Sequence, residues 1–93
     1  MNYMNSVKLL SMRKKRSRNK YIVELHNDDF NTFEHVIQTL REVCGHNYFQ
    51  ATQCAHIVHN NGMCVVFEDK QELCIQIYND LRDLGLTVKI KDV

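Results

Sequence analysis

Along the chain, segments in which apolar residues have the spacing of a strand alternate with segments in which they have the spacing of a helix. The segment 21–25 (Tyr-Ile-Val-Glu-Leu) is rich in β-forming residues and predicts a first strand. Apolar positions then repeat at helical spacing through 31–45, 47–62 and 69–85, each of which ends in glycine. Two more β-rich segments, 63–67 and 86–90, follow the second and third of these. The pattern predicts the order βααβαβ.

The starts of the three helices are predicted from capping residues. In a capping box, a polar side chain and a Glu or Gln three positions later satisfy each other's backbone N–H groups. The expected boxes are Asn31 with Glu34, Asn47 with Gln50, and Asp69 with Glu72.

The core-facing side of the third helix is expected to carry Leu73, Ile77, Leu81 and Leu84.

The length and composition favour one small domain. A chain of 93 residues, 44% of them hydrophobic, is enough for one modest core and not for two. The element order predicts an α+β fold, a two-layer sandwich in which helices pack on a small three-stranded sheet. No apolar run approaches the length of a membrane span, and 7–10 is too short for a signal peptide. We therefore expect a cytoplasmic protein.

Charge divides the chain into two parts. Seven of the 12 Lys and Arg lie within 1–20, where there is no acidic residue. The rest of the chain holds the other five and all 11 Asp and Glu. This predicts a basic, flexible N-terminal extension, 1–19, before an acidic domain, 20–93. The extension could contact RNA, DNA or an acidic protein face. Nucleic-acid binding is not favoured, because no aromatic platform or groove-reading helix accompanies it.

The four cysteines, at positions 44, 54, 64 and 74, stand mostly in apolar surroundings and form no Cys-x-x-Cys pair. We interpret them as buried free thiols of a cytoplasmic protein. A disulfide framework is the alternative.

The candidate chemistry lies in Asn27, Asp28 and Asp29, between the first strand and the first helix, with His59 about thirty residues later. Taken alone, the first three could form an ordinary polar turn. His59 and His56 have a spacing that could present two metal ligands, but spacing supplies no third. No phosphate loop or nucleophile motif occurs, so neither an enzyme nor a cofactor is predicted.

Four segments in order carry a family resemblance. They are 21–30 (Tyr-Ile-Val-Glu-Leu-His-Asn-Asp-Asp-Phe), 34–37 (Glu-His-Val-Ile), 50–53 (Gln-Ala-Thr-Gln) and 58–62 (Val-His-Asn-Asn-Gly). This set closely resembles ClpS, the adaptor family of the bacterial and plastid N-end rule. The resemblance is strong over 20–67, weaker beyond, and does not cover the basic extension.

The resemblance implies an adaptor that binds a free N-terminal Phe, Leu, Tyr or Trp. It would deliver such N-degron substrates to a Clp AAA+ unfoldase of the ClpA or ClpC type, with no role for a membrane. The substrate α-amino group would be held by Asn27, Asp29 and His59, with Asp28 in a supporting place. The side-chain pocket would fall on Leu25, Asn31, Phe33, Val36, Ala55, Val58 and Val88.

Two positions depart from the family pattern. Phe33 and Ala55 stand where methionine is common in ClpS sequences, so the side chain is enlarged at position 33 and reduced at position 55. Positions that contact the unfoldase in the family do not align cleanly. Two alternatives therefore stay open: an interaction or regulatory module of this fold without degron delivery, and a nucleic-acid-associated regulator acting through the basic extension.

Overall fold

The computed structural model describes residues 20–93, so the predicted extension at 1–19 lies outside the described residues. Three strands and three helices follow one another in the predicted order, and the α+β prediction is confirmed. The elements are β1 (Lys20–His26), α2 (Phe33–Cys44), α3 (Tyr48–Asn61), β2 (Met63–Lys70), α4 (Gln71–Asp83) and β3 (Val88–Asp92).

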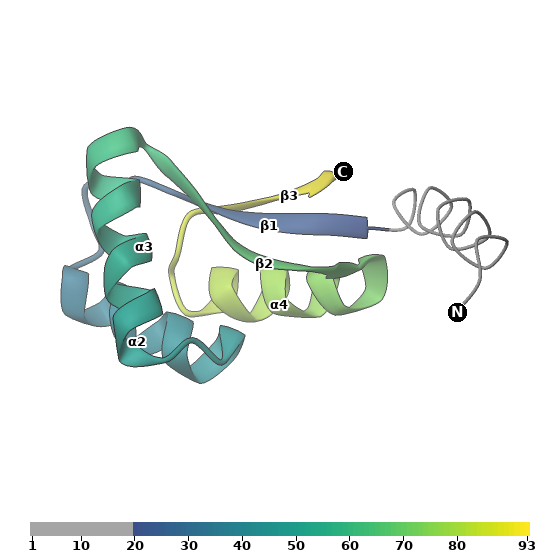
Figure 1. Cartoon of the computed structure of the whole chain (residues 1–93), viewed down its shortest axis with the longest axis horizontal. Helices are drawn as coiled ribbons and strands as arrows, with labels where there is room; N and C mark the ends of the chain where they lie inside the picture. Colours follow the sequence, from purple (N-terminus) through teal and green to yellow (C-terminus); the bar gives the residue numbers. More distant parts are fainter. Residues whose placement is uncertain (1–19) are drawn as a thin grey trace, which may run out of the picture.

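The sheet is antiparallel, with the strand order β2-β1-β3 and β1 in the centre. Leu25 pairs with Cys64 on one side and with Val88 on the other. The register between β1 and β2 shifts by one residue after Val23, so that Val66 forms a β-bulge and is buried. Figure 1 shows α4 running along the sheet, with α2 and α3 gathered at the end where β1 finishes.

The core joins the helices to the central strand. The largest fully buried side chains are Val23 and Leu25 of β1, Leu40 of α2, and Cys74 and Leu81 of α4. Ala51 and Val58 of α3 belong to the same cluster. Among the helices, α4 packs most directly on β1, and the end of β1 lies beside α2 and α3 (Figure 1), which is where the candidate site lies.

The capping box of α3 is confirmed. Asn47 Oδ1 accepts from the Gln50 amide at 2.8 Å, and Gln50 Oε1 accepts from the Asn47 amide at 3.0 Å. The box predicted for α2 is wrong, because the N-cap is Thr32, whose hydroxyl accepts from the His35 amide at 3.1 Å. Asn31 is instead bonded to Asp28.

The predicted start and inner face of α4 are also wrong in part. Asp69 still pairs with Tyr21 in the sheet, so Lys70 occupies the N-cap position and no side chain caps the helix. The helix presents Cys74 and, as predicted, Leu81 to the core, each 0% exposed. The predicted inner residues Leu73 and Leu84 are 39% and 45% exposed, whereas Ile77 packs against the core as expected.

The four cysteines are free thiols, as predicted. Cys74 is fully buried, and the other three are partly buried. Within residues 20–93, no helix has the length and apolar character needed to cross a membrane.

Candidate functional site

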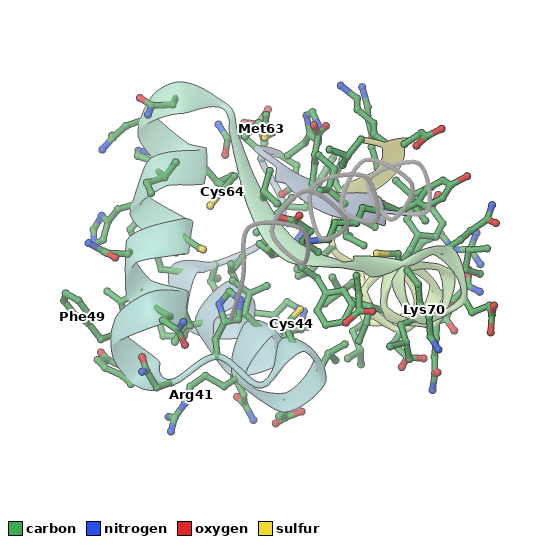
Figure 2. The ribbon with its side chains drawn as sticks, turned by 45° about the vertical axis from the view of Figure 1, so that its right-hand side comes forward. Arg41, Cys44, Phe49, Met63, Cys64 and Lys70 are labelled. Carbon is green, nitrogen blue, oxygen red and sulfur yellow. The ribbon has the colours of Figure 1, made fainter. Side chains whose placement is uncertain are left out.

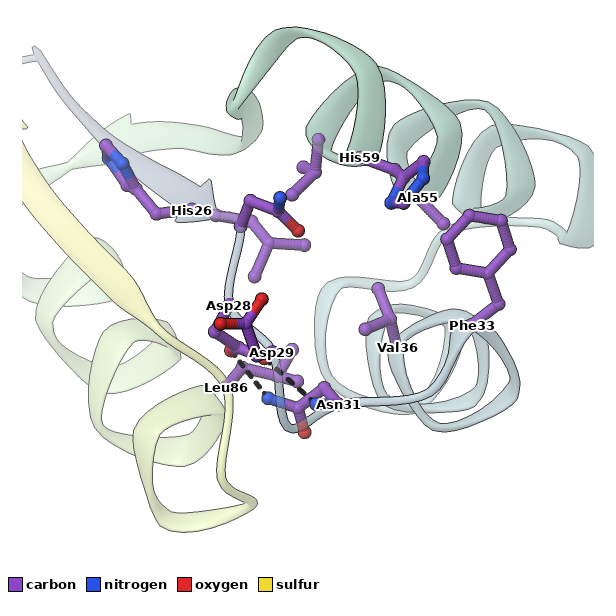
Figure 3. Close-up of a pocket in the computed structure, with 12 residues that line it drawn as sticks. His26, Asp28, Asp29, Asn31, Phe33, Val36, Ala55, His59 and Leu86 are labelled. Carbon is purple, nitrogen blue, oxygen red and sulfur yellow. Dashed lines mark hydrogen bonds between the residues drawn. The ribbon is translucent and has the colours of Figure 1, made fainter.

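A cavity of about 340 Å³ lies between the loop after β1, the start of α2 and the second half of α3. In Figure 3, Asp28, Asp29 and Asn31 lie on one side of it, and Phe33, Val36, Ala55 and His59 lie on the other. The structure thus brings together ten of the eleven residues predicted for the site. They are Leu25, Asn27, Asp28, Asp29, Asn31, Phe33, Val36, Ala55, Val58 and His59.

Val88 is the exception and does not line the cavity. It is buried in the core as the first residue of β3, where it pairs with Leu25. The wall at this place is formed by Leu86, which precedes the strand and is 3% exposed. Val88 had been assigned to the pocket from the family resemblance, which is weaker in this part of the chain; Leu86 lies in the loop before β3, which begins at Val88.

Backbone hydrogen bonds hold the loop after β1 in place. The His26 amide donates to the Thr87 carbonyl at 2.8 Å, and the Asn27 amide donates to the Gly62 carbonyl at 3.0 Å. Gly62 ends α3 with φ +93°, a left-handed conformation that favours glycine. The polar loop is thereby fastened to the end of the helix that carries His59.

The carboxylate of Asp28 is fully engaged within the protein. Its Oδ1 accepts from the amides of Phe30 and Asn31, both at 2.9 Å. Its Oδ2 accepts from Asn31 Nδ2 at 2.7 Å and from the Thr87 hydroxyl at 2.8 Å. Partial burial raises the pKa of Asp28, but these four hydrogen bonds outweigh it and lower the pKa to about 2.

Asn31 also links this loop to the end of α4 by a hydrogen bond. Its side-chain amide also donates to the Gly85 carbonyl at 2.9 Å. His35, on the first turn of α2, lies 2.7 Å from the Leu84 carbonyl through Nε2. Thr87, the hydroxyl partner of Asp28, was missed by the sequence reasoning, because it lies 59 positions away and no local pattern marks it.

Asn27, Asp29 and His59 are in the opposite situation. All three are solvent-exposed at the cavity. Among the residues that the structure describes, none forms a hydrogen bond with the side chain of Asn27, Asp29 or His59. Together they offer an amide oxygen, a carboxylate and an imidazole nitrogen beside apolar walls.

Phe33 lies at the edge of this cavity against two imidazoles of α3. Its ring centroid is 5.0 Å from that of His56 and 5.4 Å from that of His59, in edge-to-face geometry with interplanar angles of 82° and 86°. Within the described part of the chain, no three potential metal ligands cluster. His56 and His59, one helical turn apart, both contact the ring of Phe33.

Comparisons with known proteins identify the family of the chain. The family model of the ATP-dependent Clp protease adaptor protein ClpS matches residues 16–89. The ClpS adapter protein of Nostoc sp. strain PCC 7120 is 36% identical over 69 residues, 73% of this chain and 71% of that protein. Its counterpart from Synechocystis sp. strain PCC 6803 is 36% identical over 63 residues, 67% of this chain and 64% of that protein.

The same fold occurs in a solved structure, that of Agrobacterium tumefaciens ClpS2 bound to L-phenylalaninamide. The two structures superpose with a TM-score of 0.78 over 82% of this chain and 99% of that one, at 22% sequence identity. At this identity the likeness shows a shared fold, and the family match shows the relationship. The chain belongs to the ClpS family of Clp protease adaptor proteins.

Proposed function

We propose that this protein binds substrate proteins through a free N-terminal residue with a bulky apolar side chain (Phe, Leu, Tyr or Trp). The observation that carries the proposal is the contrast between two adjacent carboxylates. Asp28 is saturated by four hydrogen bonds within the protein, whereas Asp29 faces the cavity beside Asn27 and His59. This leaves one uncompensated negative charge at the entrance of a partly apolar cavity.

A protonated α-amino group fits this set of acceptors. An ammonium has three N–H donors, and Asn27 Oδ1, an Asp29 oxygen and the neutral imidazole of His59 supply three acceptors. The contact with Asp29 is charge-assisted and is the strongest of the three. An acetylated nitrogen has a single donor and no charge, so acceptors would be left unpaired at about 1–3 kcal/mol each.

The apolar part of the cavity fits the side chain of the same residue. Leu25, Val36, Ala55, Val58 and Leu86 supply its walls. Burying a large side chain there contributes roughly 1.5–3 kcal/mol. L-Phenylalaninamide, the molecule bound in the Agrobacterium protein, combines a free α-amino group with such a side chain. We infer that this protein requires both features together.

Binding of two peptides that differ only at their first nitrogen tests the proposal. A fluorescent peptide beginning with Phe should bind, and its N-acetylated copy should bind at least tenfold more weakly. Asp29→Ala should nearly abolish binding of the free peptide while leaving the unfolding temperature unchanged. Glu72→Ala is the matched control: Glu72 is an exposed acid in the first turn of α4, outside the cavity. Equal affinities for the free and acetylated peptides would refute the proposal.

As a Clp adaptor, the protein would then deliver the bound substrate to a Clp AAA+ unfoldase of the ClpA or ClpC type. Adaptors of this kind act by binding, and the proposal assigns no catalytic residue. Delivery is measured as ATP-dependent degradation of a reporter beginning with Phe, with and without this protein. Acceleration by the wild type but not by Asp29→Ala is expected. Peptide binding without acceleration by either unfoldase would favour an interaction module that lacks delivery.

A further inference from the structure

Two cysteines outside the cavity lie in direct contact behind its wall. The Sγ atoms of Cys54, on α3, and Cys64, on β2, are 3.2 Å apart and share an S–H···S hydrogen bond. Cys64 lies on the part of β2 that runs beside α3 (Figure 2). A disulfide bond is about 2.05 Å long, so the sulfurs need approach by only about 1.2 Å for a bond to form.

The two elements that would be joined also form the cavity. Cys54 immediately precedes Ala55, which lines the cavity from α3. Cys64 pairs across the sheet with Leu25, which lines it from β1. Between the two cysteines, the chain reverses direction at Gly62. A bond here would therefore fasten the second half of α3 to the strand beside it.

The other cysteines are arranged differently. Cys74 is fully buried in the core, where its thiol contacts the carbonyl oxygens of Tyr21 and Asp69 at 3.3 and 3.4 Å. Cys44 is close enough to Cys54 to influence its ionisation, and the packing around Cys44 raises its own pKa to about 12. Only the pair formed by Cys54 and Cys64 has a sulfur–sulfur hydrogen bond among the described residues.

We propose that Cys54 and Cys64 are a redox modification site, a dithiol that a peroxide converts reversibly into a disulfide. The reaction is balanced with hydrogen peroxide as the oxidant. The thiolate of Cys64 attacks one peroxide oxygen, giving a sulfenic acid and releasing the other oxygen as water. The sulfur of Cys54 then attacks the sulfenic sulfur, the S–S bond forms, and the hydroxyl leaves as a second water with the remaining proton. Two electrons pass from the two thiols to the peroxide.

The environment of Cys54 agrees with its role as the second thiol. Burial, the contact with Cys64 and the nearby Cys44 raise the pKa of Cys54 to about 12. At neutral pH it is therefore held as a thiol, protected from direct reaction with the oxidant until a sulfenic acid forms on its neighbour. This inference does not depend on the proposed peptide binding and can fail or succeed separately.

Thiol mapping of the full-length protein tests the proposal. The folded protein is treated with increasing hydrogen peroxide and then denatured, so that buried thiols such as Cys74 also become accessible; the remaining thiols are alkylated, and peptides are identified by mass spectrometry. We expect a loss of about 2 Da and one cross-linked peptide joining Cys54 to Cys64. Cys44 and Cys74 should stay alkylatable, and dithiothreitol should reverse the change. The disulfide should also raise the unfolding temperature and slow amide exchange in the second half of α3.

Variants and an internal reference make the outcome decisive. Cys64→Ser should remove the cross-linked peptide, and the matched variant Cys74→Ala should keep it. Met63 is 37% exposed and immediately precedes Cys64, so its oxidation to sulfoxide reports how much oxidant has reached this end of β2. The proposal is overturned if both thiols remain free once Met63 is oxidised. It is equally overturned if the disulfide joins Cys44 to either of them, or if Cys64 stops at an uncross-linked sulfinic acid.

Discussion

Replacing Asp28 by alanine should destabilise the fold, although Asp28 lies on the surface loop that carries the candidate site. The substitution removes the common acceptor of four donors, from the backbone of Phe30 and Asn31 and the side chains of Asn31 and Thr87. These donors connect the loop after β1 with the loop before β3. Without the carboxylate, Thr87 keeps its backbone bond from the His26 amide but loses its side-chain bond to the loop.

The size of the effect follows from the pKa of Asp28. A fall from the ordinary value of 3.8 to about 2 corresponds to about 2.4 kcal/mol of differential stabilisation of the carboxylate in the folded state. Asp28 is only partly buried, so solvent screening reduces this to about 1–2 kcal/mol. In a domain of this size, such a loss lowers the unfolding temperature by about 5–15 °C.

The pH dependence identifies the cause. Because the pKa of Asp28 is lower in the folded state, its contribution is complete above the ordinary pKa and disappears as the pH falls toward 2. Urea unfolding of the wild type and of Asp28→Ala should differ by a constant free energy from pH 7 to about pH 5. About half of this difference should be gone at pH 3.

The neighbouring carboxylate supplies the control. Asp29→Ala removes the same charge one position later and should leave the free energy of unfolding within about 0.5 kcal/mol of the wild type, since no described residue bonds to its side chain. If Asp28→Ala were as stable as Asp29→Ala, the hydrogen-bonded loop would not contribute as argued. A difference that persisted unchanged at pH 3 would show that the loss does not arise from the ionised carboxylate.

Three further predictions concern binding and delivery. Ala55→Met should fill part of the cavity. In fluorescence anisotropy, its affinity for a Trp-initiated peptide should fall on the order of tenfold more than its affinity for a Leu-initiated one. An equal loss of affinity for both peptides would mean that Ala55 does not line the side-chain pocket. His59→Ala should weaken Phe-peptide binding in fluorescence anisotropy, because the ammonium loses one of its three acceptors; equal affinity of the variant and the wild type would remove His59 from the amine site. Removing residues 1–19 should leave peptide affinity unchanged, because the cavity is built from residues 25–86, while slowing unfoldase-dependent degradation; unimpaired degradation would mean that the extension has no delivery role.

The features that could be predicted from sequence are those set by neighbouring residues. The strand and helix order follows from the two hydrophobic periods, and the capping box of α3 depends only on Asn47 and Gln50. The glycines after α2 and α3 were recognised as stops because a left-handed residue ends a helix most readily when it is glycine. Such signals are local, so one sequence contains them in full.

The errors arose where a distant segment decides the outcome. Asn31 and Thr32 are both good N-cap residues, and Thr32 serves because Asn31 is engaged by Asp28 and by the Gly85 carbonyl. On α4, Ile77 and Leu81 face the core as predicted, but Cys74 completes this face and Leu73 does not. Leu73 and Cys74 point in directions about 100° apart around the helix, and which of them faces inward depends on how α4 lies on the sheet, which no local pattern specifies.

The two aspartates show why the composition of a binding motif does not by itself identify the groups that bind. Asp28 accepts from the amides two and three residues ahead, so it forms the turn and its oxygens are occupied. Asp29, one position on, has its carboxylate at the cavity. Because Asp28 fixes the loop before any ligand arrives, binding should lose little entropy in ordering Asn27 and Asp29. An Asp28 variant should therefore weaken binding through a loosened loop, whereas an Asp29 variant loses the charge that the ammonium requires.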